Sequence, residues 1–133
     1  MALEIERRFL IKNNNWKKFI TKKIFIEQGY LSKSLDDWII RIRFTGKDYK
    51  IALKKHIKSF TNFEFEYSIP IKDGEKIMSN LTNIIKKERF FLEVDNKYWI
   101  IDCFKEKNYP LEIAEIELSN EEEDLFLPFF ISK

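Results

Sequence analysis

Residues 4–8, EIERR, place two glutamates and an arginine at alternate positions near the start of the chain. Successive side chains of a β-strand point to opposite faces, so Glu4, Glu6 and Arg8 would share one face and Ile5 and Phe9 the other. Two carboxylates side by side on one face repel each other unless a cation lies between them. The stretch therefore raises the question of whether its charged face meets water or a ligand.

The composition is that of a globular, β-rich domain. The 133 residues are 44% hydrophobic and 35% charged, which separates the chain from disordered sequences. Aromatic residues reach 16%, and such side chains favour strands. Cys103 has no second cysteine to pair with, and the length suffices for a hydrophobic core without disulfides. We expect one domain over residues 1–133.

The overall charge excludes some partners. The formal net charge is only +2, from 24 basic and 22 acidic residues, so the chain has no general attraction to nucleic acid or anionic membranes. The N-terminus has no apolar signal-like stretch, and no run of about 18 apolar residues occurs. We expect a soluble, cytoplasmic protein that is either a monomer or a homodimer.

Short apolar or alternating segments predict eight strands, at residues 2–12, 23–32, 38–44, 47–56, 62–71, 87–94, 97–104 and 110–118. Asn residues and helical apolar spacing predict two short helices, at 13–22 and 73–87. Asp95 and Asn96 predict a tight turn that joins the sixth and seventh strands as a hairpin. The pattern favours an α+β, mostly β fold: an eight-stranded antiparallel closed barrel, or a strongly curved sheet, with two or more short flanking helices.

Charged residues on these strands are sorted by sign. Opposite the aliphatic residues, same-sign pairs two apart recur on five strands: Glu4 and Glu6, Arg41 and Arg43, Glu64 and Glu66, Lys87 and Arg89, and Glu115 and Glu117, with Lys50 and Lys54 four apart on a sixth. A strand of this kind, taken alone, normally turns its charged face to water. A solubilising surface mixes the two signs, however, so the sorting favours a divalent cation among the acids and a polyanion among the bases.

Such a ligand requires the charged faces to look into the barrel. An eight-stranded barrel has room for one small ligand. Its aliphatic residues would then face outward and need a cover, which the two helices and the apolar segment 124–130 could supply in part.

The ordered set of charged segments resembles the CYTH superfamily, the triphosphate tunnel metalloenzymes. EIERRFL (4–10) resembles the Glu-x-Glu-x-Lys signature, with Arg8 at the lysine position. The resemblance continues in order through EQGYL (27–31), RIR (41–43), LK (53–54), FEFE (63–66), KERF (87–90), WIIDCF (99–104) and LEIAEIEL (111–118). It implies an eight-stranded tunnel and metal-dependent hydrolysis of tripolyphosphate, a nucleoside triphosphate or thiamine triphosphate, with release of orthophosphate.

The resemblance also implies roles for individual residues. Hard carboxylate oxygens suited to Mg²⁺ or Mn²⁺ would come from Glu4, Glu6, Glu115 and Glu117. Phosphate oxygens would be bound by Arg8, Arg41, Arg43, Lys54, Lys87 and Arg89. The remaining acids, Glu64, Glu66 and Asp102, would hold the basic side chains in place, help hold a second metal or hold the attacking water. Glu66 and Asp102 are the candidates for orienting that water.

Other interpretations stay open at this point. Some members of the family cyclise ATP, so a CYTH-type adenylyl cyclase is one alternative, and a non-catalytic polyphosphate or nucleotide-binding module is another. The near-neutral charge argues against a barrel that binds single-stranded nucleic acid. Tyr30 could line the tunnel or pack, and Gly29 could mark a bulge or a close approach. We expect no catalytic role for His56 or Cys103.

Overall fold

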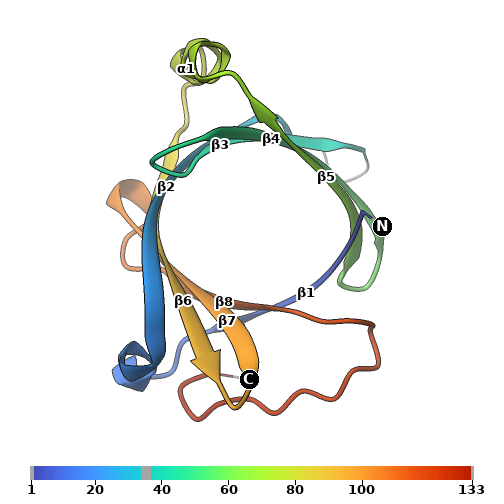
Figure 1. Cartoon of the computed structure of the whole chain (residues 1–133), viewed down its shortest axis with the longest axis vertical. Helices are drawn as coiled ribbons and strands as arrows, with labels where there is room; N and C mark the ends of the chain where they lie inside the picture. Colours follow the sequence, from blue (N-terminus) through green and yellow to red (C-terminus); the bar gives the residue numbers. More distant parts are fainter. Residues whose placement is uncertain (1, 34–36, 133) are drawn as a thin grey trace.

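The strands of the computed structural model, which describes residues 2–33 and 37–132, close into a barrel (Figure 1). The order around the wall is β1-β5-β4-β3-β2-β6-β7-β8, and every neighbouring pair is antiparallel. The strands are β1 (Leu3–Leu10), β2 (Ile20–Lys33), β3 (Ile39–Phe44), β4 (Tyr49–Lys58), β5 (Thr61–Ile69), β6 (Ile85–Val94), β7 (Lys97–Phe104) and β8 (Glu112–Glu117). The predicted eight-stranded closed barrel is confirmed.

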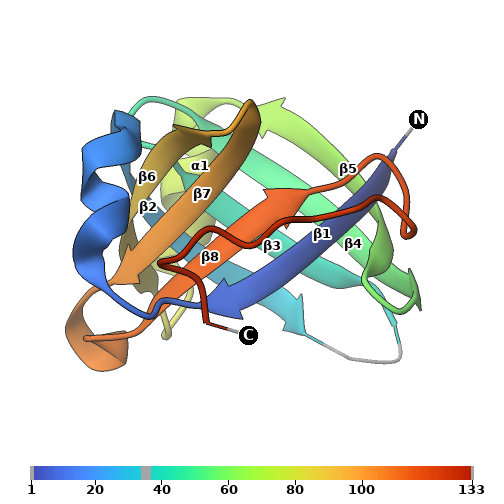
Figure 2. The same cartoon turned by 90° about the horizontal axis from the view of Figure 1, so that it is seen from below.

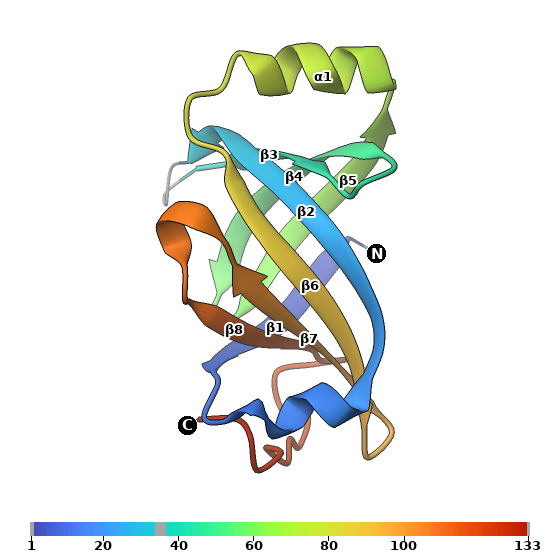
Figure 3. The ribbon, with the colours of Figure 1, turned by 90° about the vertical axis from the view of Figure 1, so that its left-hand side faces the viewer.

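The strand β2 runs along the full length of the barrel wall (Figure 3). It pairs with β3 on one side and β6 on the other, and its pairing with β3 shifts in register between Tyr30 and Ser32. A Cβ atom at Gly29 would lie 2.6 Å from Cδ1 of Leu81, which is closer than real Cβ contacts allow. The absence of a side chain at Gly29 therefore lets Leu81, in the segment before β6, pack closely against β2, next to the register shift in that strand.

The first predicted helix is shorter than expected and of a different kind. Residues Asn14–Phe19 form a 3₁₀ helix, η1, whose start is capped by the Asn13 side chain accepting a hydrogen bond of 2.9 Å from the Asn15 backbone N–H. The last three residues of the predicted segment 13–22 belong instead to β2, because Ile20 already pairs with Leu92 of β6. Pairing with a neighbouring strand overrides the weak helical spacing.

The second predicted helix ends early. Helix α1 covers Ile71–Ser79, where the prediction was 73–87. The side-chain amide of Asn80 donates a hydrogen bond of 2.8 Å to the carbonyl of Lys76 and ends the helix. Ile84 therefore lies outside it, and Ile85 begins β6 opposite Gln28. Figure 3 shows α1 lying across the outside of the barrel, where it contacts β3 and β4.

Short connections complete the wall. Asp95 and Asn96 both have positive φ, of 50° and 63°, and join β6 to β7 in the predicted hairpin. A third short helix, η2 (Glu106–Asn108), lies between β7 and β8. None of the helices in the described ranges has the length and apolar character needed to cross a membrane.

The main hydrophobic core lies outside the barrel wall, between β6, β7, β8 and β1 and the segments that cover them. Trp16 of η1, Trp99 of β7 and Phe130 of the C-terminal segment are at most 1% exposed. Figure 2 shows residues 118–132 running across β8 and β1. The backbone N–H of Lys12 donates to the Phe130 carbonyl at 2.8 Å, which anchors this segment. The expected cover of the outward aliphatic face by 124–130 is thus present.

Phe130→Ala should lower the free energy of unfolding by about 3–5 kcal/mol, because it removes a fully buried aromatic ring and leaves a cavity. The matched control is Phe126→Ala in the same segment, whose side chain is 93% exposed and whose removal should change stability by less than about 0.5 kcal/mol. Urea denaturation measures both. Equal effects of the two substitutions would contradict the burial of Phe130 in the core.

Candidate functional site

A cavity of about 220 Å³ occupies the interior of the barrel, and twelve of its fifteen lining residues are charged. Strand alternation explains this: β7, for instance, directs Trp99 and Ile101 outward into the core and Ile100 and Asp102 inward. Every predicted site residue except Asp102 lines the cavity: Glu4, Glu6, Arg8, Arg41, Arg43, Lys54, Glu64, Glu66, Lys87, Arg89, Glu115 and Glu117. The tunnel brings the predicted set together, while the roles of its members stay predictions.

One wall carries an excess of acid. Along the β1–β8 pairing Glu6 lies opposite Glu117 and Arg8 opposite Glu115. Burial, followed by the negative charges of Glu115 and Glu4, raises the pKa of Glu6 to about 8. The Nε atom of Arg8 lies 3.6 Å from a Glu6 oxygen and 3.8 Å from a Glu115 oxygen. Because the Arg8 side chain is 61% exposed, its positive charge neutralises these two carboxylates only in part. This wall favours an added proton or cation.

Glu4 has a different environment. Its carboxylate lies 2.8 Å from Nζ of Lys54 and accepts a hydrogen bond of 3.3 Å from the Asn62 side chain. Burial alone would raise the pKa of Glu4, but Lys54 and Asn62 outweigh it and lower the pKa. Lys54 also lies 3.7 Å from Glu64. Glu4 is therefore already balanced by a lysine, whereas Glu6 is not.

The opposite wall carries an excess of base around one buried carboxylate. Asp102 is 0% exposed, lies 2.7 Å from Nζ of Lys87 and accepts two hydrogen bonds from Arg89, at 2.9 and 3.0 Å. Burial, together with Arg89 and Arg43, lowers the pKa of Lys87 to about 8. Burial, together with Arg41 and Arg89, lowers the pKa of Arg43 to about 10. One carboxylate does not balance this many cations.

Arg41 supplies a further unsatisfied donor. Its Nη2 atom lies 3.4 Å from Glu66 and 3.9 Å from Glu64, while its Nε atom is buried with no hydrogen-bond partner among the described residues. Glu66 also lies 3.9 Å from Nζ of Lys50 and keeps 36% of its side chain exposed. A buried guanidinium donor without an acceptor is costly, so an oxygen of a ligand would stabilise it.

The acidic wall suits a hard divalent cation in its chemistry, although no three Asp, Glu, His or Cys side chains form a ready-made metal cluster within residues 2–33 and 37–132. After burial, the negative charge of Glu115 is the next cause of the raised pKa of Glu6, and Arg8 lies within 4 Å of both carboxylates. Mg²⁺ commonly takes one or two carboxylates and completes its octahedron with water and phosphate oxygens. The carboxylates of Glu6 and Glu115 fit that kind of site.

Three lining residues were not among the predicted site residues: Gln28, Tyr30 and Ile100. Gln28 is 4% exposed, and its Oε1 accepts a hydrogen bond of 2.9 Å from Nε of Arg43. Tyr30 lines the tunnel, which decides between the two alternatives left open for it. Gln28 and Tyr30 are two apart on β2, so strand alternation could have placed both once Tyr30 was assigned inward.

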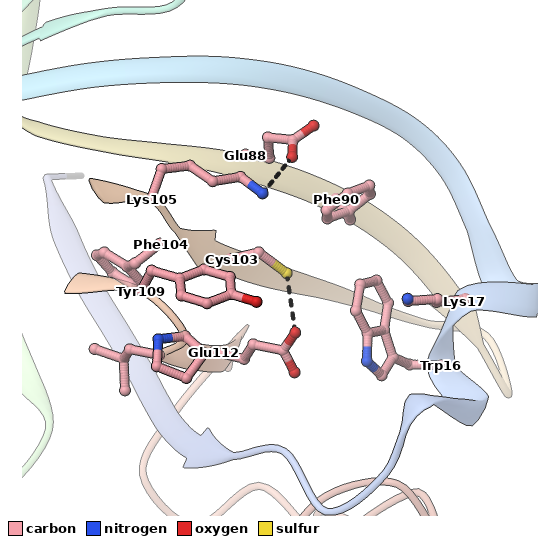
Figure 4. A pocket seen from close by; sticks show the side chains of 11 residues that line it. Trp16, Lys17, Glu88, Phe90, Cys103, Phe104, Lys105, Tyr109 and Glu112 are labelled. Atoms are coloured by element: carbon pink, nitrogen blue, oxygen red, sulfur yellow. Dashed lines mark hydrogen bonds and ion pairs between the residues drawn. The ribbon is translucent and has the colours of Figure 1, made fainter. Parts of the chain in front are cut away.

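Two residues expected to be inert lie outside the tunnel. His56 is exposed, with Nδ1 at 3.3 Å from Oδ1 of Asn62. Cys103 lies in a separate cavity of about 240 Å³ on the outer face of the barrel, where its thiol contacts Glu112 at 3.6 Å (Figure 4). Burial and the Glu112 carboxylate raise the pKa of this thiol to about 12, which suppresses its nucleophilic thiolate form.

Comparison with curated proteins shows a similarity to an inorganic triphosphatase. An inorganic triphosphatase of Acetivibrio thermocellus is 32% identical to this chain over 124 residues, which covers 91% of this chain and 78% of that protein. No protein-family model matches the chain.

Solved structures share the fold. The inorganic triphosphatase NE1496 superposes with a TM-score of 0.68 at 23% identity, covering 98% of this chain and 87% of that one. A Hippeastrum protein, studied as an adenylyl cyclase and described as having a dominant triphosphatase activity, superposes with a TM-score of 0.67 at 13% identity. That match covers 90% of this chain and 80% of the Hippeastrum chain. At these identities the two structures support the barrel architecture.

Asp102→Asn should lower the free energy of unfolding by about 3–5 kcal/mol, because Lys87 and Arg89 would stay buried without their counter-ion. Burial opposes ionisation of Asp102, but Arg89 and Lys87 outweigh it and lower its pKa. The ionised Asp102 carboxylate therefore stabilises the fold fully above pH 3.8, which is the ordinary pKa of an aspartate. This stabilisation is lost as the pH falls through the lowered pKa.

The loss in free energy of unfolding caused by Asp102→Asn should therefore become smaller as the pH falls below 3.8. Urea denaturation of the variant and the wild type at several pH values measures this. Asp95→Asn, in the exposed hairpin turn, is the matched control and should have little effect. A deficit that does not depend on pH would argue against the ion pairs as its cause.

Proposed function

The chain belongs to the CYTH superfamily, the triphosphate tunnel metalloenzymes, and on that premise we propose that it hydrolyses a triphosphate bound inside the barrel and releases orthophosphate. The observation that carries this proposal is the pair of opposite charge excesses within one tunnel. The pKa of Glu6 is raised to about 8, while those of Lys87 and Arg43 are lowered to about 8 and about 10. A polyanion together with a divalent cation would relieve both.

The basic side chains would bind the phosphate oxygens. Arg43 and Arg89 present planar guanidinium groups that match phosphate oxygens in pairs, and Lys87 adds a point charge. The unpartnered Nε of Arg41 offers one more donor to the same anion. Because the groups are already held by Gln28, Asp102 and Glu66, little reorganisation is needed when charge develops on the phosphate during reaction.

The acidic wall would hold the metal ion. We propose Glu6 and Glu115 as the principal ligands of Mg²⁺ or Mn²⁺, with Glu117 and Glu4 nearby, and Glu4 least available because Lys54 neutralises it. A divalent cation there would supply Lewis-acid neutralisation of the phosphate oxygens. Arg8, beside the same two carboxylates, is placed to contact the anion once its carboxylate partners are occupied.

Glu66 is the better of the two candidates for orienting the attacking water. Its carboxylate lines the cavity and is partly exposed. Asp102 is fully buried and has both oxygens engaged by Lys87 and Arg89, so we propose that it positions these cations. In-line attack by the water on the terminal phosphorus would then release orthophosphate.

Inorganic tripolyphosphate fits the tunnel better than a larger organic ester. The cavity of about 220 Å³ is lined almost wholly by charged groups, and Tyr30 is the one aromatic ring among its described lining residues. Base recognition generally relies on stacking against aromatic side chains. This lining favours phosphate recognition over nucleoside recognition, and hence hydrolysis over ATP cyclisation.

Glu115→Gln should abolish metal-dependent hydrolysis of tripolyphosphate while leaving the fold intact, because it removes a metal-binding charge at almost constant volume. Glu112→Gln is the matched control on the same strand, since Glu112 faces the outer cavity, and it should retain activity. Phosphate release is measured from tripolyphosphate, ATP and thiamine triphosphate, each with Mg²⁺, Mn²⁺ or EDTA. Full activity of Glu115→Gln would refute the metal assignment.

Two other outcomes of that assay would point to different functions. Formation of cyclic AMP from ATP would identify a cyclase. Absence of turnover with every substrate, combined with thermal stabilisation by tripolyphosphate, would identify a binding module.

The affinity for tripolyphosphate should fall as the pH rises above 8. Lys87 has a lowered pKa of about 8, so its positive charge is present below that pH and is lost above it. Isothermal titration calorimetry in EDTA measures this without a contribution from metal binding. Lys87→Arg is the control, because its charge persists: its affinity should fall less near pH 8 than that of the wild type, and the remaining fall comes from ionisation of Glu6, whose pKa is also about 8. A wild-type affinity independent of pH would contradict the role of Lys87.

A further inference from the structure

The two ends of the tunnel differ in charge. Strand β2 runs from one end to the other, with Thr21 and Lys33 near its two termini and separated by about 40 Å of extended chain. Lys33 lines a cavity at one end and Thr21 a cavity at the other, and each cavity shares residues with the central one. These two openings are called here the basic mouth and the acidic mouth.

The basic mouth is a cavity of about 260 Å³ whose charged lining residues are all cations: Arg8, Lys33, Arg41 and Lys54. Lys33 is exposed, and its Nζ lies 5.1 Å from the centre of the Tyr30 ring, which places the ammonium at the rim. Because Lys33 is exposed at this rim, its charge can act on an approaching anion.

The acidic mouth is a cavity of about 200 Å³ whose charged lining residues are all carboxylates: Glu6, Glu115 and Glu117. Tyr98, 74% exposed, forms part of its lining. Lys22 stands beside it, with Nζ 5.6 Å from the centre of the Phe91 ring. Arg8 also lies 3.6 Å from Glu6 and 3.8 Å from Glu115, so two cations face three carboxylates here, and in the absence of a metal ion this mouth is less favourable to an anion than the basic mouth.

We propose that anions enter and leave the tunnel through the basic mouth and that Lys33 steers them there, while the carboxylates of the acidic mouth disfavour their entry until a metal ion binds. The proposal rests on the proposed function, in that it assumes a polyphosphate as the ligand. A narrow opening lined by one sign of charge with low-dielectric walls concentrates the field and speeds association of an oppositely charged ligand by 10-fold or more. Lys33 lies outside the central cavity and so acts on the approach, not on the bound phosphate.

The test compares one charge change at each mouth. Lys33→Glu reverses the charge at the basic mouth, and Tyr98→Lys adds a positive charge at the acidic mouth. The association rate of tripolyphosphate is measured by stopped-flow tryptophan fluorescence in EDTA, at low and at high salt. The ratio kcat/KM is measured with Mg²⁺. Lys33→Gln adds an intermediate charge, and thermal denaturation checks that every variant folds.

Lys33→Glu should slow association by about three- to tenfold at low salt, with Lys33→Gln in between, and the difference should vanish at high salt because exposed charges are screened. The value of kcat should not change. Tyr98→Lys should alter association by less than about twofold. If Tyr98→Lys speeds association, in EDTA or with Mg²⁺, as much as Lys33→Glu slows it, or if Lys33→Glu has no effect, the proposal is wrong.

The two proposals fail in different ways. If the wild-type protein hydrolyses none of the triphosphates but still binds tripolyphosphate with the Lys33 dependence, the proposed function fails and the assignment of the mouths stands. If the wild-type protein hydrolyses tripolyphosphate but the Lys33 variants bind it at the wild-type rate, the proposed function stands and the assignment of the mouths fails.

Discussion

The buried carboxylate of Asp102 is the interaction on which the tunnel depends. Lys87 and Arg89 lie in the wall of a barrel, largely removed from water, and ammonium and guanidinium groups are costly to bury without a counter-ion. Asp102 takes both of them at hydrogen-bonding distance from the neighbouring strand. It stabilises the two cations without neutralising them completely, and so leaves positive charge directed into the cavity.

The same arrangement requires the hydrophobic core to lie elsewhere. With charged side chains inside, the apolar side chains of β6, β7, β8 and β1 face outward and would be exposed on a bare barrel. The helix η1 and the C-terminal segment cover them through Trp16 and Phe130. On the other side of the barrel, α1 covers β3 and β4. These covering elements allow the interior to be given over to charge.

Within the tunnel, the two excesses of charge stay apart because the strands that carry them lie on different parts of the wall. Glu6 and Glu115 are on adjacent strands, β1 and β8, whereas Arg41 and Arg43 are on β3. Complete mixing of these side chains would let them neutralise one another. Their separation leaves places where an anion and a cation stabilise the protein side by side, and it gives the two mouths opposite charge.

Strand alternation let the sequence by itself predict the eight strands and place their charged residues on one face, because the period of two assigns each side chain to a face. The sorting of charge by sign and the resemblance to the CYTH superfamily then predicted that this face lines a closed barrel. The sequence could not determine where a helix yields to a strand, as at Ile20 and Ile85, because those residues are held by pairing with β6 and β2. Nor could it distinguish Asp102, buried beneath two cations, from Glu66, which reaches the cavity. The tertiary structure decided that difference in burial, together with the contact of Gln28 with Arg43, because burial and contacts depend on which strands become neighbours when the barrel closes.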